Sequence, residues 1–167
     1  ILQIITAHGE HIADGMLIDP SASTSYTVLI NYPGVDRIFL HCPGANDTFG
    51  ANDVPYESIQ QARLFHFGYP PLMQMIFQQH GTQLVELFRR AKKTGVTTSL
   101  DMAFPDPASA PGRADWRRIL EQTLPWVDIF LPSVEETLFM LRRDLYFQLS
   151  ENAGAAGIAS LLTPGIL

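Results

Sequence analysis

Two styles of hydrophobic pattern divide the chain. Residues 15 to 41 carry three short apolar runs, at 16–18, 26–30 and 37–40, with turn-forming Asp-Pro and Pro-Gly pairs and a serine-rich stretch between them. Short β-type runs bounded by such turn formers are typical of antiparallel strands. The pattern therefore predicts a three-stranded meander, which cannot bury both of its faces alone.

From residue 53 onward, helical and strand patterns alternate. We expect strands at residues 64–67, 96–100 and 127–131. Helices are expected where capping residues or an apolar face indicate them: after Asp53 and Pro55, along Leu84, Leu87, Phe88 and Ala91, after Asp115, and from Ser133. Parallel strands need a long crossover, which these helices supply, so the second part is predicted to be an α/β core with a parallel sheet.

Each predicted strand of this core ends in residues suited to binding. Gly68-Tyr69 follows the first strand, Asp101 the second and Pro132-Ser133 the third. Ligands of open parallel sheets gather at the carboxyl ends of the strands. We expect these residues to lie side by side at one edge.

Composition and charge narrow the class of protein. The chain has 167 residues, of which 46% are apolar, and a net charge of −6, which argues against a nucleic-acid partner. The apolar runs are far shorter than the roughly 20 residues of a membrane-spanning helix. The single cysteine, Cys42, agrees with a reducing compartment. These features predict a cytoplasmic protein that acts on small molecules and binds neither nucleic acid nor membrane.

Several common sites are missing from the sequence. It contains neither a P-loop pattern nor the G-x-G-x-x-G pattern of dinucleotide-binding folds, and its histidines and lone cysteine do not form a zinc ligand set. We therefore expect no direct metal ligands and no conventional nucleotide loop.

Four motifs, in this order, carry a resemblance. PGAN (43–46), FHFGYP (65–70), SLDMAFPDP (99–107) and DIFLPSVEE (128–136) resemble the middle of the ribokinase-like, or phosphofructokinase B, family of carbohydrate kinases. The resemblance implies a parallel-sheet core with helices on both faces and a small β-sheet lid. It further implies transfer of the ATP γ-phosphoryl group to a hydroxyl of a sugar or nucleoside with Mg²⁺. The lid would be residues 15–41, and the core residues 1–14 and 42–167.

The resemblance also implies site residues. Those placed near the substrate are His41, Asn46, Gly68, Tyr69 and Asp101, and those that organise phosphate and Mg²⁺ are Ser133 and Glu136.

Each of these residues also has a purely structural interpretation. Asn46 and Asp101 can satisfy turn and loop amides, and His41 can be a surface residue at a strand end. Ser133 and Glu136 form the Ser-x-x-Glu pattern of a helix capping box.

The sequence departs from the family at several positions. Ala103 and Pro105 stand where the family has Asn and Arg, and Ser133 stands where it usually has Asn. The family's catalytic-base motif, Gly-Ala-Gly-Asp, does not occur in this chain, and the small-residue stretch 153–157 has no Asp. We therefore expect the chain to be a central fragment that is inactive alone, with the base outside it.

Two other functions remain open. A noncatalytic ribokinase-like binding or regulatory protein would explain the departures from the family. An unrelated lyase or isomerase could use Asp101 and His66 at the strand ends. We expect the amphipathic lid to project from the core and either to pair with a second copy, as a homodimer through lid contacts, or to close over ligand.

Overall fold

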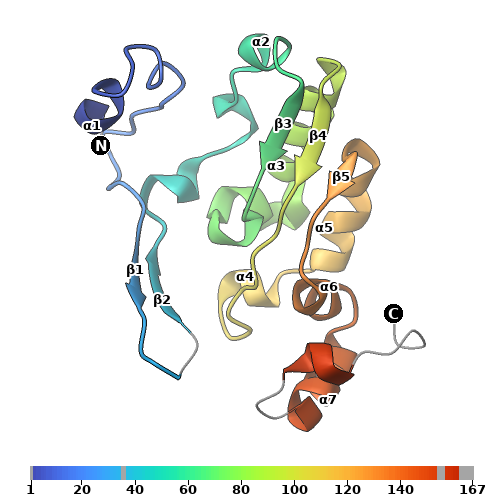
Figure 1. Ribbon diagram of the computed structural model, residues 1–167. Coiled ribbons are helices and arrows are strands. Elements are labelled where there is room, and N and C mark those ends of the chain that lie inside the picture. Colours follow the sequence, from blue (N-terminus) through green and yellow to red (C-terminus); the bar gives the residue numbers. More distant parts are fainter. Residues whose placement is uncertain (1, 35–36, 154–156, 162–167) are drawn as a thin grey trace.

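The computed structural model describes residues 2–34, 37–153 and 157–161. It contains an antiparallel hairpin and, beside it, a parallel sheet with helices (Figure 1). The strands are β1 (Tyr26–Ile30), β2 (Ile38–Cys42), β3 (Leu64–Phe67), β4 (Thr97–Leu100) and β5 (Ile129–Phe130). The helices are α1 (Leu2–Thr6), α2 (Tyr56–Ile59), α3 (Gln74–Lys93), α4 (Ala110–Arg113), α5 (Trp116–Thr123), α6 (Val134–Leu141) and α7 (Arg143–Ala153).

The predicted fold class is confirmed. Strands β3, β4 and β5 pair in parallel in that order, and α3 and α5 connect them as crossover helices. The small antiparallel sheet of β1 and β2 lies apart from this core (Figure 1). All three predicted core strands are observed; β4 begins one residue later than predicted, and β5 keeps only Ile129 and Phe130 of the predicted run 127–131.

Aromatic and aliphatic side chains hold the parallel sheet against α3. Leu84, Leu87 and Phe88 are fully buried on the helix, and they pack in one cluster with Phe67 and Leu100 of the strands. The Phe88 ring meets the Phe67 ring edge to face, with centroids 6.2 Å apart. Such pairs add to the hydrophobic contribution of their buried area.

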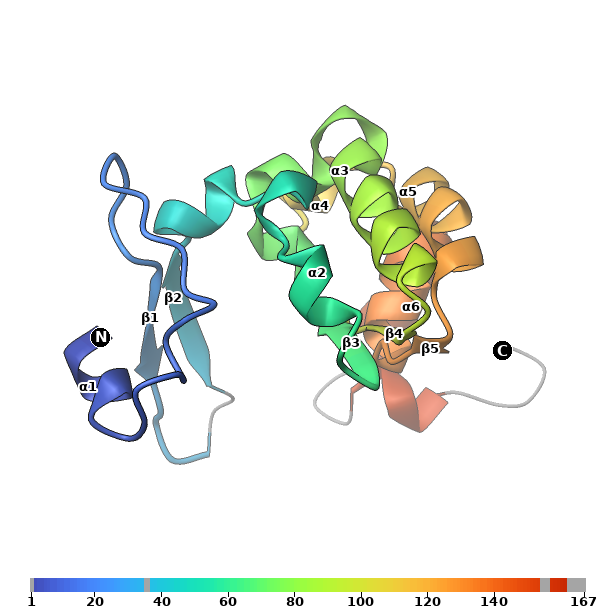
Figure 2. The ribbon, with the colours of Figure 1, turned by 90° about the horizontal axis from the view of Figure 1, so that it is seen from above.

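Both crossover helices lie on the same side of the sheet (Figure 2). Right-handed crossovers between strands in sequential order place these two connections on one face. The opposite face carries Leu64 and Ile129, which are 50% and 41% exposed. Parallel sheets are usually covered on both faces, whereas these two side chains are about half exposed in the part of the chain that the structure describes.

The predicted three-stranded meander is wrong in one strand. Residues 16–18 have no strand in the structure, and the sheet is the two-stranded hairpin of β1 and β2. The run is only three residues long, and Pro20 directly after Asp19 has no N–H to continue a ladder. The segment instead turns at Asp19, whose carboxylate accepts the Ser21 N–H at 2.8 Å.

The predicted cap at Asp53 is also wrong. Its carboxylate accepts the N–H of Gly50 at 2.7 Å and closes the short 3-10 turn Ala51–Asp53. Helix α2 begins three residues further on, at Tyr56, and has no side-chain cap. By contrast, Asp115 caps α5 as expected and accepts the Arg118 N–H at 3.1 Å.

Helix α3 contains a break that ends at Gly81, where the helix packs against α5. Residues 78–81 leave helical geometry, and Gln79, His80 and Gly81 all have positive φ. A Cβ on Gly81 would lie 2.6 Å from Ile119 Cγ2, so only glycine permits α5 to approach this closely. The break therefore allows tight packing between the two crossover helices.

Asp128 joins α3 to the sheet. Lys92 of α3 donates to both of its carboxylate oxygens, and the N–H and hydroxyl of Thr98 on β4 donate to one of them. The hydrogen bonds from Lys92 and from the Thr98 N–H hold the pKa of Asp128 below its usual range. Asp128 therefore stabilises the fold while it is ionised.

We expect Asp128→Asn to lower stability at pH 7 and to make unfolding less sensitive to acid. A lowered folded pKa gives a contribution that is present above the unfolded value of about 4 and is lost as pH falls through the folded pKa. Urea unfolding followed by tryptophan fluorescence at pH 7 and pH 3 measures both effects. The control is Glu121→Gln, because Glu121 pairs with Arg117 on the exposed surface of α5. The same loss of stability in Asp128→Asn at both pH values would contradict the role of the ionised carboxylate.

Candidate functional site

The carboxyl ends of β3, β4 and β5 lie side by side, as predicted. The Tyr69 N–H donates to the Asp101 carbonyl at 3.4 Å, and the Leu131 N–H donates to the Leu100 carbonyl at 2.9 Å. Gly68 and Tyr69, Asp101, and Ser133 therefore follow three neighbouring strands at one edge. This edge is the first part of the candidate site.

Tyr69 and Asp101 end their strands in different ways. Tyr69 has a left-handed backbone, with φ 65° and ψ 44°, and its side chain is 52% exposed. Strained positions of this kind often cluster at binding sites. The Asp101 carboxylate accepts the N–H of Met102 at 2.9 Å, which fixes it at the tip of β4.

Ser133 and Glu136 form the predicted capping box. The Glu136 N–H donates to Ser133 Oγ at 3.2 Å, and the Ser133 N–H donates to Glu136 Oε2 at 2.6 Å. The structural interpretation of this pair is thus confirmed. The same hydrogen bonds hold the Glu136 carboxylate at the first turn of α6, beside the strand ends.

Asn46 and His41 lie at the base of the hairpin. Asn46, in the 3-10 helix Gly44–Thr48, donates through Nδ2 to Ser25 Oγ at 3.1 Å. His41 Nδ1 lies 2.8 Å from Thr27 Oγ1 across the hairpin. Its Nε2 is buried and has no hydrogen-bond partner within the part of the chain that the structure describes.

Gly44 lets two segments cross at this base. The Ala45 N–H donates to the Ser23 carbonyl at 2.8 Å, and a Cβ on Gly44 would lie 2.3 Å from that same oxygen. Gly44 also has a φ of 51°, which L side chains rarely adopt. The Pro43-Gly44 turn therefore sets where the hairpin leaves the core.

A cavity of about 870 Å³ lies between the hairpin base and β3. Residues from the 15–20 segment, the 3-10 turns and β3 line it, among them Asn46, Asp19, Phe49 and His66. Of the site residues that the ribokinase-like resemblance implies, all of which the structure describes, Asn46 is the one found in this lining; His66, a candidate for the lyase or isomerase alternative, also lines it. The cavity and the strand-end group are thus two neighbouring parts of the candidate site.

Asp19 is a polar residue of this cavity that the sequence pattern assigned only to a turn. Hydrogen bonds from the Ser21 hydroxyl, the Ser21 N–H and the Thr48 hydroxyl hold the pKa of Asp19 below its usual range. An Asp-x-Ser pattern predicts such a turn, but the contact with Thr48 is 29 residues distant in sequence. No local pattern could have placed this carboxylate in the cavity.

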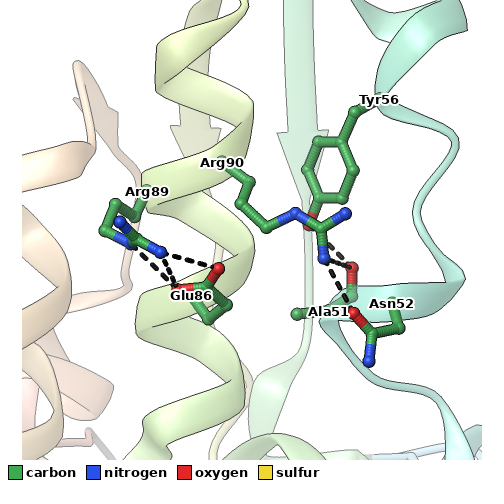
Figure 3. A network of polar contacts seen from close by, with 6 residues as sticks. All are labelled: Ala51, Asn52, Tyr56, Glu86, Arg89 and Arg90. Carbon is green, nitrogen blue, oxygen red and sulfur yellow. Dashed lines mark hydrogen bonds and ion pairs between the residues drawn. The ribbon is translucent and has the colours of Figure 1, made fainter.

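A polar network fixes the cavity wall to α3 (Figure 3). The Arg90 guanidinium lies 4.0 Å from the centre of the Tyr56 ring and donates to Asn52 Oδ1 at 2.8 Å and to the Ala51 carbonyl at 3.2 Å. The Tyr56 hydroxyl donates to the same carbonyl at 2.8 Å. Burial raises the pKa of Tyr56, so this hydroxyl keeps its proton at neutral pH. Residues 51–56 are therefore held as a unit on α3.

We searched the described residues for a cluster of metal ligands and for a helix that could span a membrane. No group of three or more His, Cys, Asp or Glu side chains that could hold a metal ion occurs among them. Nor is any helix in these ranges long and apolar enough to cross a membrane.

Comparison with known proteins supports the fold. No family model matches the chain, and no curated protein matches it. A ribokinase from Giardia lamblia is similar in structure, with a TM-score of 0.54 and 21% sequence identity over 97% of this chain and 46% of that chain. A solved structure described as Sa239 has a TM-score of 0.49 and 20% identity, over 80% of this chain and 39% of that chain. The chain thus has a ribokinase-like fold and spans less than half the length of these structures.

Proposed function

We propose that the chain is part of a carbohydrate kinase that transfers the γ-phosphoryl group of ATP to a hydroxyl of a sugar or nucleoside. The observation that carries the proposal is the edge where Gly68, Asp101 and Ser133 follow three adjacent parallel strands, beside a small hairpin. The likeness to the Giardia ribokinase supports the fold to which this edge belongs.

In this proposal the residues at the strand ends have different roles in binding. Asp101 faces the substrate and phosphate, while Gly68 and Tyr69 shape the approach to it. Asn46 and His41, at the hairpin base, bind sugar hydroxyls when the hairpin closes. The catalytic base comes from a segment outside this sequence. Phosphoryl transfer depends largely on positioning and on electrostatic stabilisation. Binding residues that come from several chain segments can supply both.

ATP and Mg²⁺ belong to the proposal, but the described residues fit the ion only indirectly. They contain no cluster of metal ligands, and the Glu136 carboxylate already accepts one backbone N–H. Glu136 would therefore orient water around the ion rather than bind it. When bound, Mg²⁺ would neutralise charge on the transferred phosphate.

A second function has a specific motivation. Ala103 and Pro105 replace the Asn and Arg expected after Asp101, and the Ser133-Glu136 pair is satisfied by its own capping contacts. A noncatalytic binding or regulatory protein with the same fold would need none of these groups for chemistry. Activity of the full-length protein separates this alternative from a kinase.

The decisive assay is ADP formation from ATP by the full-length protein, measured with a panel of sugars and nucleosides. A kinase produces ADP only when its acceptor is present. Glu136→Gln is expected to lower turnover and to raise the Mg²⁺ requirement with little change in melting temperature, because Gln also closes a capping box. Glu135→Gln, at the preceding residue of α6, is the matched control. Binding of a sugar without any ADP formation would favour the noncatalytic alternative, and equal turnover of Glu136→Gln at limiting Mg²⁺ would exclude the role in ordering the ion.

We expect Asn46→Ala in the full-length protein to weaken sugar binding while ATP affinity stays near wild type. A sugar hydroxyl left without a partner in a closed site costs about 1 to 3 kcal/mol. Calorimetric titration of sugar and nucleotide measures both affinities. Ser25→Ala is the control, because it removes the observed hydrogen bond of Asn46 but leaves its amide in place. Equal sugar affinity in both variants, with equally lowered melting temperatures, would assign Asn46 to the turn alone.

The hairpin face suggests how copies of the protein associate. The apolar cross-strand pairs Val28 with Leu40 and Ile30 with Ile38 lie on one face, and all four side chains are 45% to 55% exposed. We propose that this face forms a homodimer. A flat apolar hairpin with open edges is otherwise an aggregation risk.

Sedimentation of the full-length protein over a wide concentration range tests the dimer. We expect the wild type to be dimeric and Leu40→Lys to be monomeric, because a charge on this face opposes its burial. Ile4→Lys, at an exposed apolar position of α1, is expected to leave the dimer intact. A wild type that stays monomeric at every concentration would rule out the interface.

A further inference from the structure

The space beside Gly68 lies between polar side chains of two neighbouring strands. A Cβ built on Gly68 would lie 3.6 Å from His66 Nε2 and 3.9 Å from Asp101 Cβ. Both distances are ordinary van der Waals contacts, and the backbone of Gly68 is not in the left-handed region. Glycine is therefore not needed here for folding, and its missing side chain leaves a small space that His66 and Asp101 share.

Ser99 fixes the orientation of His66. The two residues are directly paired across β3 and β4, and His66 Nδ1 lies 3.1 Å from Ser99 Oγ. Ser99 is only 2% exposed, and a buried hydroxyl needs an acceptor for its hydrogen. We assign Nδ1 as that acceptor, which places the ring hydrogen on Nε2, the atom beside Gly68.

The space thus has a donor on one side and an acceptor on the other. His66 Nε2–H can donate to an oxygen, and the Asp101 carboxylate, held by the Met102 N–H, can accept from a hydroxyl. Each hydroxyl group both donates and accepts, so two hydroxyl groups on adjacent carbons can use this donor and this acceptor together. His66 also lines the large cavity, whereas Gly68 and Asp101 are not part of that lining.

We propose that the space beside Gly68 is a hydroxyl-binding subsite for a polyol, in which His66 and Asp101 bind neighbouring hydroxyl groups. Ser99 is the positioning residue, since it acts only through the His66 ring. Gly68 determines selectivity, because any side chain would occupy the place of a hydroxyl group. The identification of the polyol with a sugar rests on the proposed kinase function.

Gly68→Ala is the sharpest test, because a methyl group fills the space without backbone strain. Calorimetric titration of D-ribose and D-fructose into the full-length protein is expected to show affinity at least tenfold lower than wild type. The melting temperature should stay unchanged. His66→Leu, which removes the donor, should weaken binding similarly, and His8→Leu, an exposed histidine near the N-terminus, should not.

Ser99→Ala separates positioning from packing. It leaves the His66 ring in place but frees its rotation, so sugar affinity should fall less than in His66→Leu. Ser58→Ala, at an exposed position of α2, is the control. Wild-type binding of a sugar with equal affinity in Gly68→Ala and His66→Leu would overturn the subsite alone. If wild type bound neither sugar, the subsite would be rejected for these polyols, and the proposed function would be rejected only if no ADP formed with any member of the sugar and nucleoside panel.

Discussion

The packing of one face of the parallel sheet on α3 is the interaction on which the rest of the structure depends. Phe67 and Leu100 end their strands inside the cluster that includes Phe88. This burial fixes where β3 and β4 stop, and the side chains that follow them, from Gly68 to Asp101, are carried to one edge. A strand shifted by one residue would turn those side chains to the other face of the sheet.

Polar contacts from α3 add specific links to this hydrophobic packing. Lys92 and Arg90 lie on α3 and reach to opposite sides, one to Asp128 before β5 and the other to residues 51 and 52. The helix thus links the sheet to the wall of the cavity. Because Arg90 combines a planar fork of donors with stacking on Tyr56, a lysine at this position could not make the same set of contacts.

Local signals in the sequence predicted much of the core but not its assembly. The strand at 64–67 and the caps at Asp115 and Ser133 follow from nearby residues, and all three are observed. The break in α3 at Gly81 depends on contact with Ile119, which is 38 residues away in the chain. The position of Asp19 in the cavity likewise depends on Thr48. Contacts of this kind leave no periodic pattern, so the edge of the site was predictable while the cavity beside it was not.

The hairpin is anchored at one end, where Gly44 and Ala45 contact residues 23–25. Each strand has five residues, which span roughly 17 Å at about 3.3 Å per residue, so a tilt of about 10° at the base moves the far end by about 3 Å. His41 lies near the base of the hairpin, whereas the pair Ile30 and Ile38 lies at its far end. A small change of angle at the base would therefore be a larger displacement at the far end of the hairpin. Restraint of that far end would, in turn, limit the tilt available at the base.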